Sequence, residues 1–181
     1  MRVWTRSVLT AVFGTALIGV SACSPGEGAG DGSPETSGTT PSGEALASVK
    51  PCEILPEETL KSFGLEPPGE PTSTLPWKPG CDYSGQPVGA RLGKNDRQTV
   101  DSAEQKTSWA EFERVQVNGR EGARFITKGA TKAQSCGVMF NSGEGVVQVI
   151  TTESGRPYNT DECQKALEIA KKVESNVPEP R

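Results

Sequence analysis

The chain of 181 residues is 33% hydrophobic and only 6% aromatic, with 21 glycines and 14 prolines, which is typical of one turn-rich domain with a small core and a linker. Its formal net charge of −4 argues against nucleic acid as a partner, because neutralising phosphates requires a basic surface. Histidine is absent, which excludes His-ligated zinc and Ser-His or Cys-His nucleophile pairs.

Residues 1–22 are interpreted as a lipoprotein signal peptide. A basic start precedes an apolar stretch, Val8–Val20, that is too short to remain as a membrane span. The sequence Val20-Ser21-Ala22-Cys23 resembles the bacterial lipobox, in which the cysteine thiol accepts a diacylglycerol group. We therefore expect Cys23 to be the lipidated N-terminus, so that membrane lipid is a partner through the acyl anchor. The alternative is an ordinary signal peptide, with Cys23 incidental.

Residues 23–49 are expected to form the lipidated cysteine and a flexible tether. Glycine, serine, threonine and proline dominate this stretch, and such a sequence buries too little apolar surface to offset its ordering entropy. A single domain is then predicted over residues 50–178.

Cysteine parity supports this organisation. Besides the lipobox cysteine the chain has four cysteines: Cys52, Cys81, Cys136 and Cys163. An even set in an exported chain indicates two disulfides, for which three pairings are possible. We favour Cys52–Cys81 and Cys136–Cys163, because each would tie the start of a helix to a nearby strand. A four-cysteine zinc site is the rival interpretation, but the chain has no C-x-x-C pair.

The first half of the domain alternates short elements with turns. Pro56 opens a short helix that Gly64 ends, and five prolines between residues 67 and 79 predict an irregular loop. Strands are expected around residues 81–84 and 88–92, and a helical turn over residues 101–106.

The second half contains two hairpins and the best helix. Phe112, Val115 and Val117 lead into Asn118-Gly119, a strong two-residue hairpin signal, and the return strand is expected at residues 123–126. The segments 136–140 and 146–150 form a second predicted hairpin. The last helix begins at Thr160 or Asp161, and its buried stripe consists of Cys163, Ala166, Leu167, Ala170 and Val173. The predicted fold class is α+β: an antiparallel sheet of about five strands, covered on one face by an N-terminal and a C-terminal helix, with two disulfides.

The arrangement resembles the actinobacterial lipoprotein family built on domain of unknown function 3558. The shared features are the lipobox and tether, the start Pro51-Cys52-Glu53-Ile54-Leu55-Pro56, the Phe63-Gly64-Leu65 at the helix end, and the cysteine that opens the last helix. Tyr83, two residues after a cysteine, stands where family members commonly carry tryptophan. The resemblance implies a cell-surface lipoprotein and supplies no functional residue.

Two loop aromatics, Trp77 and Tyr158, are the candidate ligand or partner contacts, with core packing as the alternative. A basic strip beside the first hairpin is also conceivable, with a solvated strand face as the alternative; it comprises Arg114, Arg120, Arg124 and Lys128. The acid pairs Glu57-Glu58 and Asp161-Glu162 are assigned to helix starts, where carboxylates stabilise the helix dipole.

No enzyme class is supported by a motif. The chain lacks Ser-x-x-Lys and Gly-x-Ser-x-Gly, and we predict no catalytic residue, no metal and no cofactor. The expected function is that of a non-enzymatic binding or accessory module, lipid-anchored on the extracytoplasmic face of the cell membrane. Its partner would be an unknown envelope component or protein. The alternatives are a carboxylate-based hydrolase acting on envelope glycans and a purely structural envelope protein.

Overall fold

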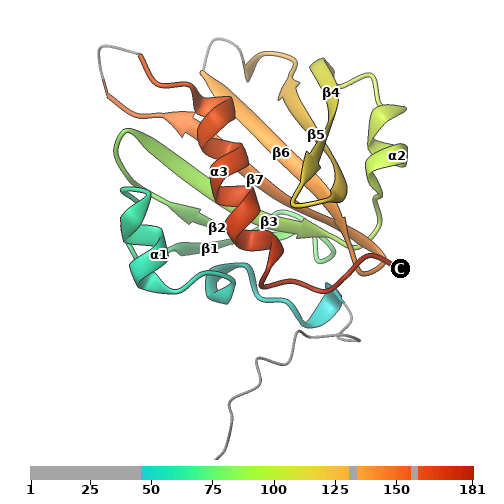
Figure 1. Cartoon of the computed structure of the whole chain (residues 1–181), viewed down its shortest axis with the longest axis horizontal. Coiled ribbons are helices and arrows are strands. Elements are labelled where there is room, and N and C mark those ends of the chain that lie inside the picture. The colour runs from blue at the N-terminus through green and yellow to red at the C-terminus, as the bar shows by residue number, and fades with distance from the viewer. Residues whose placement is uncertain (1–45, 131–133, 156–158) are drawn as a thin grey trace, which may run out of the picture. The chain divides into compact units, whose positions relative to one another are not determined.

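A seven-stranded antiparallel sheet is the framework of the computed structural model, which describes residues 46–130, 134–155 and 159–181 (Figure 1). The strands lie in the order β1-β2-β3-β7-β6-β5-β4, so the first three and the last four strands join where β3 pairs with β7. The bounds are β1 Glu70–Ser73, β2 Pro79–Tyr83, β3 Val88–Asn95, β4 Trp109–Val117, β5 Arg120–Thr127, β6 Ser135–Ser142 and β7 Gly145–Glu153.

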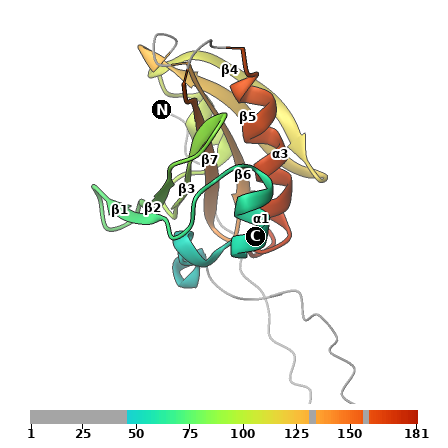
Figure 2. The same ribbon diagram turned by 90° about the vertical axis from the view of Figure 1, so that its left-hand side faces the viewer.

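The described helices lie on both faces of this sheet. Figure 2 shows α1 and α3 on the same side, which we call the helix face. The short α2 packs on the opposite face, here called the second face, against β5 and β6. The bounds are α1 Glu57–Ser62, α2 Val100–Glu104 and α3 Glu162–Glu174, with 3-10 turns η1 Leu46–Ser48 and η2 Pro51–Glu53. The predicted antiparallel sheet with terminal helices is confirmed.

The predicted number of about five strands was too low. The strand that was not predicted is β1, because most of its residues are exposed and it shows no apolar alternation. The strand predicted to enter the Asn118-Gly119 hairpin is β4. β1 lies in the proline-rich stretch that we expected to be an irregular loop. Pro71 is tolerated there because an edge strand does not need every backbone N–H for a ladder.

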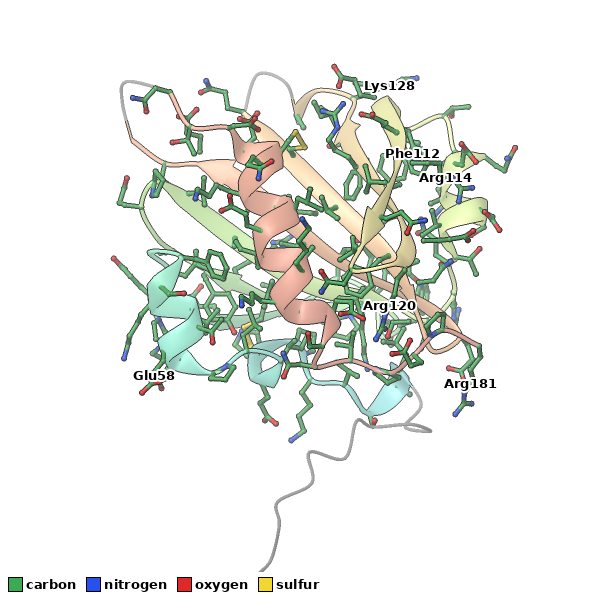
Figure 3. The ribbon with its side chains drawn as sticks, in the orientation of Figure 1. Glu58, Phe112, Arg114, Arg120, Lys128 and Arg181 are labelled. Atoms are coloured by element: carbon green, nitrogen blue, oxygen red, sulfur yellow. A yellow bond between two sulfur atoms is a disulfide. The ribbon has the colours of Figure 1, made fainter. Side chains whose placement is uncertain are left out.

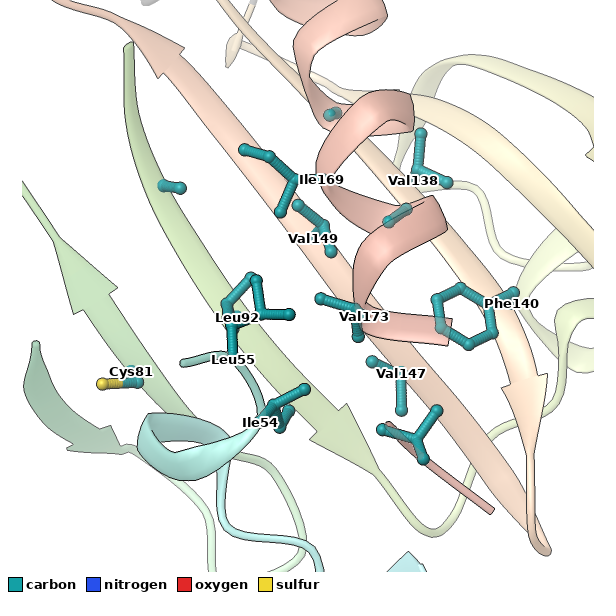
Figure 4. Packing of buried hydrophobic residues seen from close by; sticks show 14 of the residues in the cluster. Ile54, Leu55, Cys81, Leu92, Val138, Phe140, Val147, Val149, Ile169 and Val173 are labelled. Carbon is teal, nitrogen blue, oxygen red and sulfur yellow. The ribbon is translucent and has the colours of Figure 1, made fainter. Parts of the chain in front are cut away.

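The main core lies between α3, the N-terminal turns and the helix face of the sheet (Figure 4). Ile169 and Val173 of α3 pack on the central strands, whose inward side chains include Leu92, Phe140 and Val149. The predicted stripe of α3 is largely correct, although Ile169 is fully buried and Leu167 only partly.

Both favoured disulfides are present. The Cys52 and Cys81 sulfurs are 2.04 Å apart and join η2 to β2. The Cys136 and Cys163 sulfurs are 2.07 Å apart and join β6 to the first turn of α3. Each bond therefore fixes a helical element to the sheet, as the sequence predicted.

The folded region extends beyond the predicted boundaries of 50 and 178. Leu46 is completely buried, and the Lys94 ammonium donates to its carbonyl at 2.7 Å, so residues 46–49 belong to the domain rather than to the tether. At the other end, the backbone of Gly143 exchanges hydrogen bonds with Glu179 and Arg181. The predicted boundaries missed both segments because they are short and carry little apolar sequence.

Candidate functional site

The second face of the sheet has a covered half and an exposed half. Over β5 and β6, Val100 and Ala103 of α2 pack against Phe125 and Met139. Along β3 the side chains alternate, so Ala90 and Leu92 enter the main core while the intervening residues Arg91 and Gly93 lie on the second face. This half, which we call the open half, is exposed at Arg91, although Gly80, Gly93 and Gln148 within it are buried.

A hollow of about 120 Å³ lies in this open half, between the β1–β2 loop and the strands β2, β3 and β7. Its floor includes Gly80 and Gly93, which are directly paired neighbours on β2 and β3. Two glycines side by side leave a depression, because neither raises a side chain above the sheet. The walls include Thr72, Thr74, Lys78, Arg91, Gln148 and Ile150; we call this site the cationic hollow.

Arg91 is held in place by an ion pair across the strands. Its Nε and Nη2 donate to the two carboxylate oxygens of Asp82, at 2.5 and 2.6 Å. These hydrogen bonds raise the pKa of Arg91, so the guanidinium stays charged. Since Asp82 neutralises much of that charge, Arg91 contributes orientation and donors more than net charge.

Lys78 differs from Arg91 because none of the ion pairs among the described residues involves it. Desolvation of the ammonium lowers the pKa of Lys78, and the positive charges of Lys106 and Arg91 lower it further. Lys106, just after α2, donates to the side-chain carbonyl of Gln98 at 2.8 Å. Lys78 and Arg91 both line this hollow, and no acidic residue lines it.

A second, wider hollow of about 410 Å³ adjoins the first, since Arg91 and Ile150 line both. Its other lining residues include Asp82, Gly89, Ser135 and Thr152. The two hollows together form a trough that is cationic at the β1–β2 loop and neutral further along β7.

Of the two predicted contact residues, Trp77 lies close to this site. It is partly buried and directly precedes Lys78, but the guanidinium of Arg97 stacks on its ring at 3.9 Å from the centroid. One face of the indole is therefore already occupied. Tyr158 lies outside the described residues.

The predicted basic strip does not form. Arg114 pairs with Asp101 and Glu104 at α2, and Arg124 pairs with Glu111 and Glu113. Arg120 is buried beside the C-terminal end of α3, away from Lys128 (Figure 3). Arg114 and Arg124 agree with the alternative of a solvated strand face, whereas Arg120 differs from both interpretations because it is buried.

The acid pairs also lie where we assigned them. Glu57 and Glu58 are in the first turn of α1. Asp161 is the N-cap of α3, and its carboxylate accepts a hydrogen bond from the Gln164 backbone N–H at 2.9 Å. Neither pair lines the cationic hollow.

Sequence reasoning missed Lys78, Arg91, Gly93 and Gln148, although a signal was available. In β3, apolar residues alternate with glycine and arginine, a period of two that predicts one face in the core and one exposed. An exposed strand face that carries glycines instead of large polar residues indicates a close approach by another group.

Two kinds of feature are absent from the part of the chain that the structure describes. None of its helices has the length and apolar character needed to cross a membrane. Its His, Cys, Asp and Glu residues form no group of three or more that could hold a metal ion.

The fold and the site define a class of protein: a two-disulfide antiparallel α+β domain with one open sheet face. The chain belongs to the family described as "Protein of unknown function (DUF3558)", whose model matches residues 18–176. No curated protein and no solved structure matches the chain. The matched range includes the lipobox-like Val20–Cys23 and both disulfides.

Proposed function

We propose that this protein is a non-enzymatic binding module that is lipid-anchored through Cys23 on the extracytoplasmic face of the cell membrane, and that its ligand occupies the open half of the second sheet face. The lipobox-like sequence and the apolar segment before it support the anchor. Two disulfides support an oxidising compartment, because such bonds rarely persist in the cytosol.

One observation carries the binding proposal: the hollow is built into the sheet itself. An open strand face usually carries side chains that fill the space above the backbone, whereas the paired neighbours Gly80 and Gly93 carry none and leave a hollow between the surrounding side chains. Polar walls around a small apolar surface, here Ile150, are typical of ligand sites. A purely structural protein has no need for such a depression.

Gly93 offers a variant that fills the hollow without disturbing the fold. A Cβ atom at Gly93 would lie 3.5 Å from the Pro79 carbonyl oxygen and 3.9 Å from the Gly80 Cα, which is ordinary van der Waals contact. Valine also favours strands over glycine. Gly93→Val should therefore fold at least as stably as the wild type and lose the space in which the ligand binds.

The test is a thermal-shift screen of the purified protein against envelope lipids, peptidoglycan fragments and membrane extracts. A ligand at 100 times its Kd adds about 2.7 kcal/mol to the free energy of unfolding, which raises Tm by several degrees. The wild type and a control with added bulk on the helix side, Ser62→Leu, should show the shift, and Gly93→Val should not. Chemical turnover of any added compound, or an equal shift in Gly93→Val, would contradict the proposal.

The anchor is tested separately. Cys23→Ser should abolish globomycin-sensitive processing. Any protein that is still cleaved should be released from the membrane fraction. If the variant is processed and fractionates as the wild type does, the lipid anchor is wrong even where the binding module is right.

A further inference from the structure

The cationic hollow concentrates positive charge in an acidic protein. The chain has 23 acidic and 19 basic residues, yet Lys78 and Arg91 line this hollow and no acidic residue does. Lys78 has no ion pair among the described residues. An ammonium without a paired carboxylate, on the wall of a hollow that no acid lines, attracts an anion.

We propose that the cationic hollow binds a phosphate group, carried either by a lipid headgroup or by a soluble phosphoester. This inference rests on the proposed function, because it names the ligand class of the same site. Lys78 supplies the charge, and Arg91 supplies oriented donors.

The donor set fits a phosphate group better than a carboxylate. A phosphate monoester carries a charge of about −1.5 to −2 at neutral pH and three strong acceptor oxygens, one more than a carboxylate. These oxygens suit the ammonium of Lys78, the hydroxyl donors of Thr72 and Thr74 and the amide of Gln148. A Cβ atom at Gly93 would lie no closer than 3.5 Å to its neighbours, so the missing side chain leaves room for a ligand oxygen.

The surroundings also provide for the rest of the ligand. The second hollow continues from the cationic one past Ile150, which is partly buried. It is wider, at about 410 Å³, and its one acidic residue, Asp82, is already paired with Arg91. A phosphate in the first hollow would thus leave the group that it esterifies lying along β7.

The experiment is calorimetric titration of the purified protein at constant ionic strength. The probes are inorganic phosphate, glycerol 3-phosphate and monomeric dihexanoyl phosphatidylglycerol, with sodium acetate as the monovalent comparison. The site variants are Lys78→Gln and Thr72→Val, which replace two residues that line the hollow. Lys171→Gln is the matched control, because Lys171 is an exposed lysine of α3 on the helix face and its replacement removes the same charge.

We expect saturable phosphate binding that each site variant weakens about tenfold or more, the usual loss for one charge-assisted hydrogen bond, while Lys171→Gln leaves it unchanged. Tighter binding of the short-chain lipid than of glycerol 3-phosphate assigns the ligand to a headgroup, and equal binding assigns it to a soluble phosphoester.

Absence of saturable binding by every phosphate probe would overturn the inference, and so would an equal loss in Lys171→Gln. If the envelope screen still shifts the wild type but not Gly93→Val, the ligand class is wrong and the binding module stands. If that screen also fails, the proposed function fails with it.

Discussion

Replacing Arg120 by methionine should lower the free energy of unfolding of the domain more than replacing Arg91, Arg114 or Arg124 does. Arg120 begins β5, is only 7% exposed, and its guanidinium donates to the Pro178 carbonyl at 2.6 Å and to the Glu174 carbonyl at 3.2 Å. It also forms ion pairs with the Glu174 carboxylate at 2.5 Å and the Glu179 carboxylate at 3.0 Å. One side chain therefore joins the sheet to the end of α3 and to the C-terminal segment (Figure 3).

The magnitude follows from what the substitution leaves behind. The Glu174 side chain is only 13% exposed, and removing one member of a buried ion pair costs about 3–5 kcal/mol. Each carbonyl that loses its donor while buried adds to this cost, whereas Glu179, at 57% exposure, is readily solvated. Against a total stability of about 5–15 kcal/mol for a domain, the loss should lower Tm by about 10 °C or more.

Urea unfolding of the oxidised protein, followed by far-ultraviolet circular dichroism at pH 7, measures this loss directly. Arg114→Met is the control, because Arg114 pairs with Asp101 and Glu104, whose side chains are 75% and 45% exposed; it should cost less than about 1 kcal/mol. Adding Glu174→Gln to Arg120→Met should recover part of the loss by removing the unpaired charge. An Arg120→Met protein within 1 kcal/mol of the wild type would refute the reasoning.

Three further predictions concern the disulfides, the second face and pH. Replacing Cys136 and Cys163 together by alanine should lower the free energy of unfolding by about 3–4 kcal/mol, the loop-closure value for their separation of 27 residues; a chemical melt without reductant measures it, and an unchanged midpoint would contradict it. Gly137→Ala should lower the free energy of unfolding by about 1–3 kcal/mol, because the alanine Cβ would lie 2.2 Å from the Phe125 ring. Adding Phe125→Leu to the same chain should reduce this loss, and an unchanged loss would refute the clash. Phosphate affinity should fall as pH rises from 7.5 to 10, because the pKa of Lys78 is lowered and its ammonium loses its charge at a lower pH than an ordinary lysine does. The Lys78→Arg variant should keep its affinity over this range. Identical pH profiles of affinity for the wild type and Lys78→Arg, measured by calorimetry, would exclude Lys78 as the charge that binds phosphate.

The sequence predicted the elements that have strong local signals. Asn118 and Gly119 both have positive φ, at 50° and 95°, as the two-residue hairpin requires. Gly64, with φ of 76°, ends α1 because that conformation suits glycine. The disulfide pairing followed from the same local reasoning, since each cysteine of a pair lies in an element that the pattern had already placed.

The candidate site was harder to predict because it depends on contacts that are distant in sequence. Lys78 and Gln148 line one hollow only because β2 and β7 both flank β3 in the sheet, and nothing in either segment indicates the other. Arg120 appeared to belong to a surface strip, yet the C-terminal segment buries it. The side chain of a long cation gives no sign of burial in the sequence, because its carbonyl partners are backbone atoms.

The central claim is that a ligand occupies the open half of the second sheet face of a lipid-anchored protein. The most direct test is purification of the native lipidated protein from membranes, followed by mass spectrometry of the compounds that copurify, in parallel for the wild type and Gly93→Val. The account predicts one compound that is present at a fixed ratio to the wild type and absent from the equally stable variant. The same compounds at the same ratio in both preparations would contradict it.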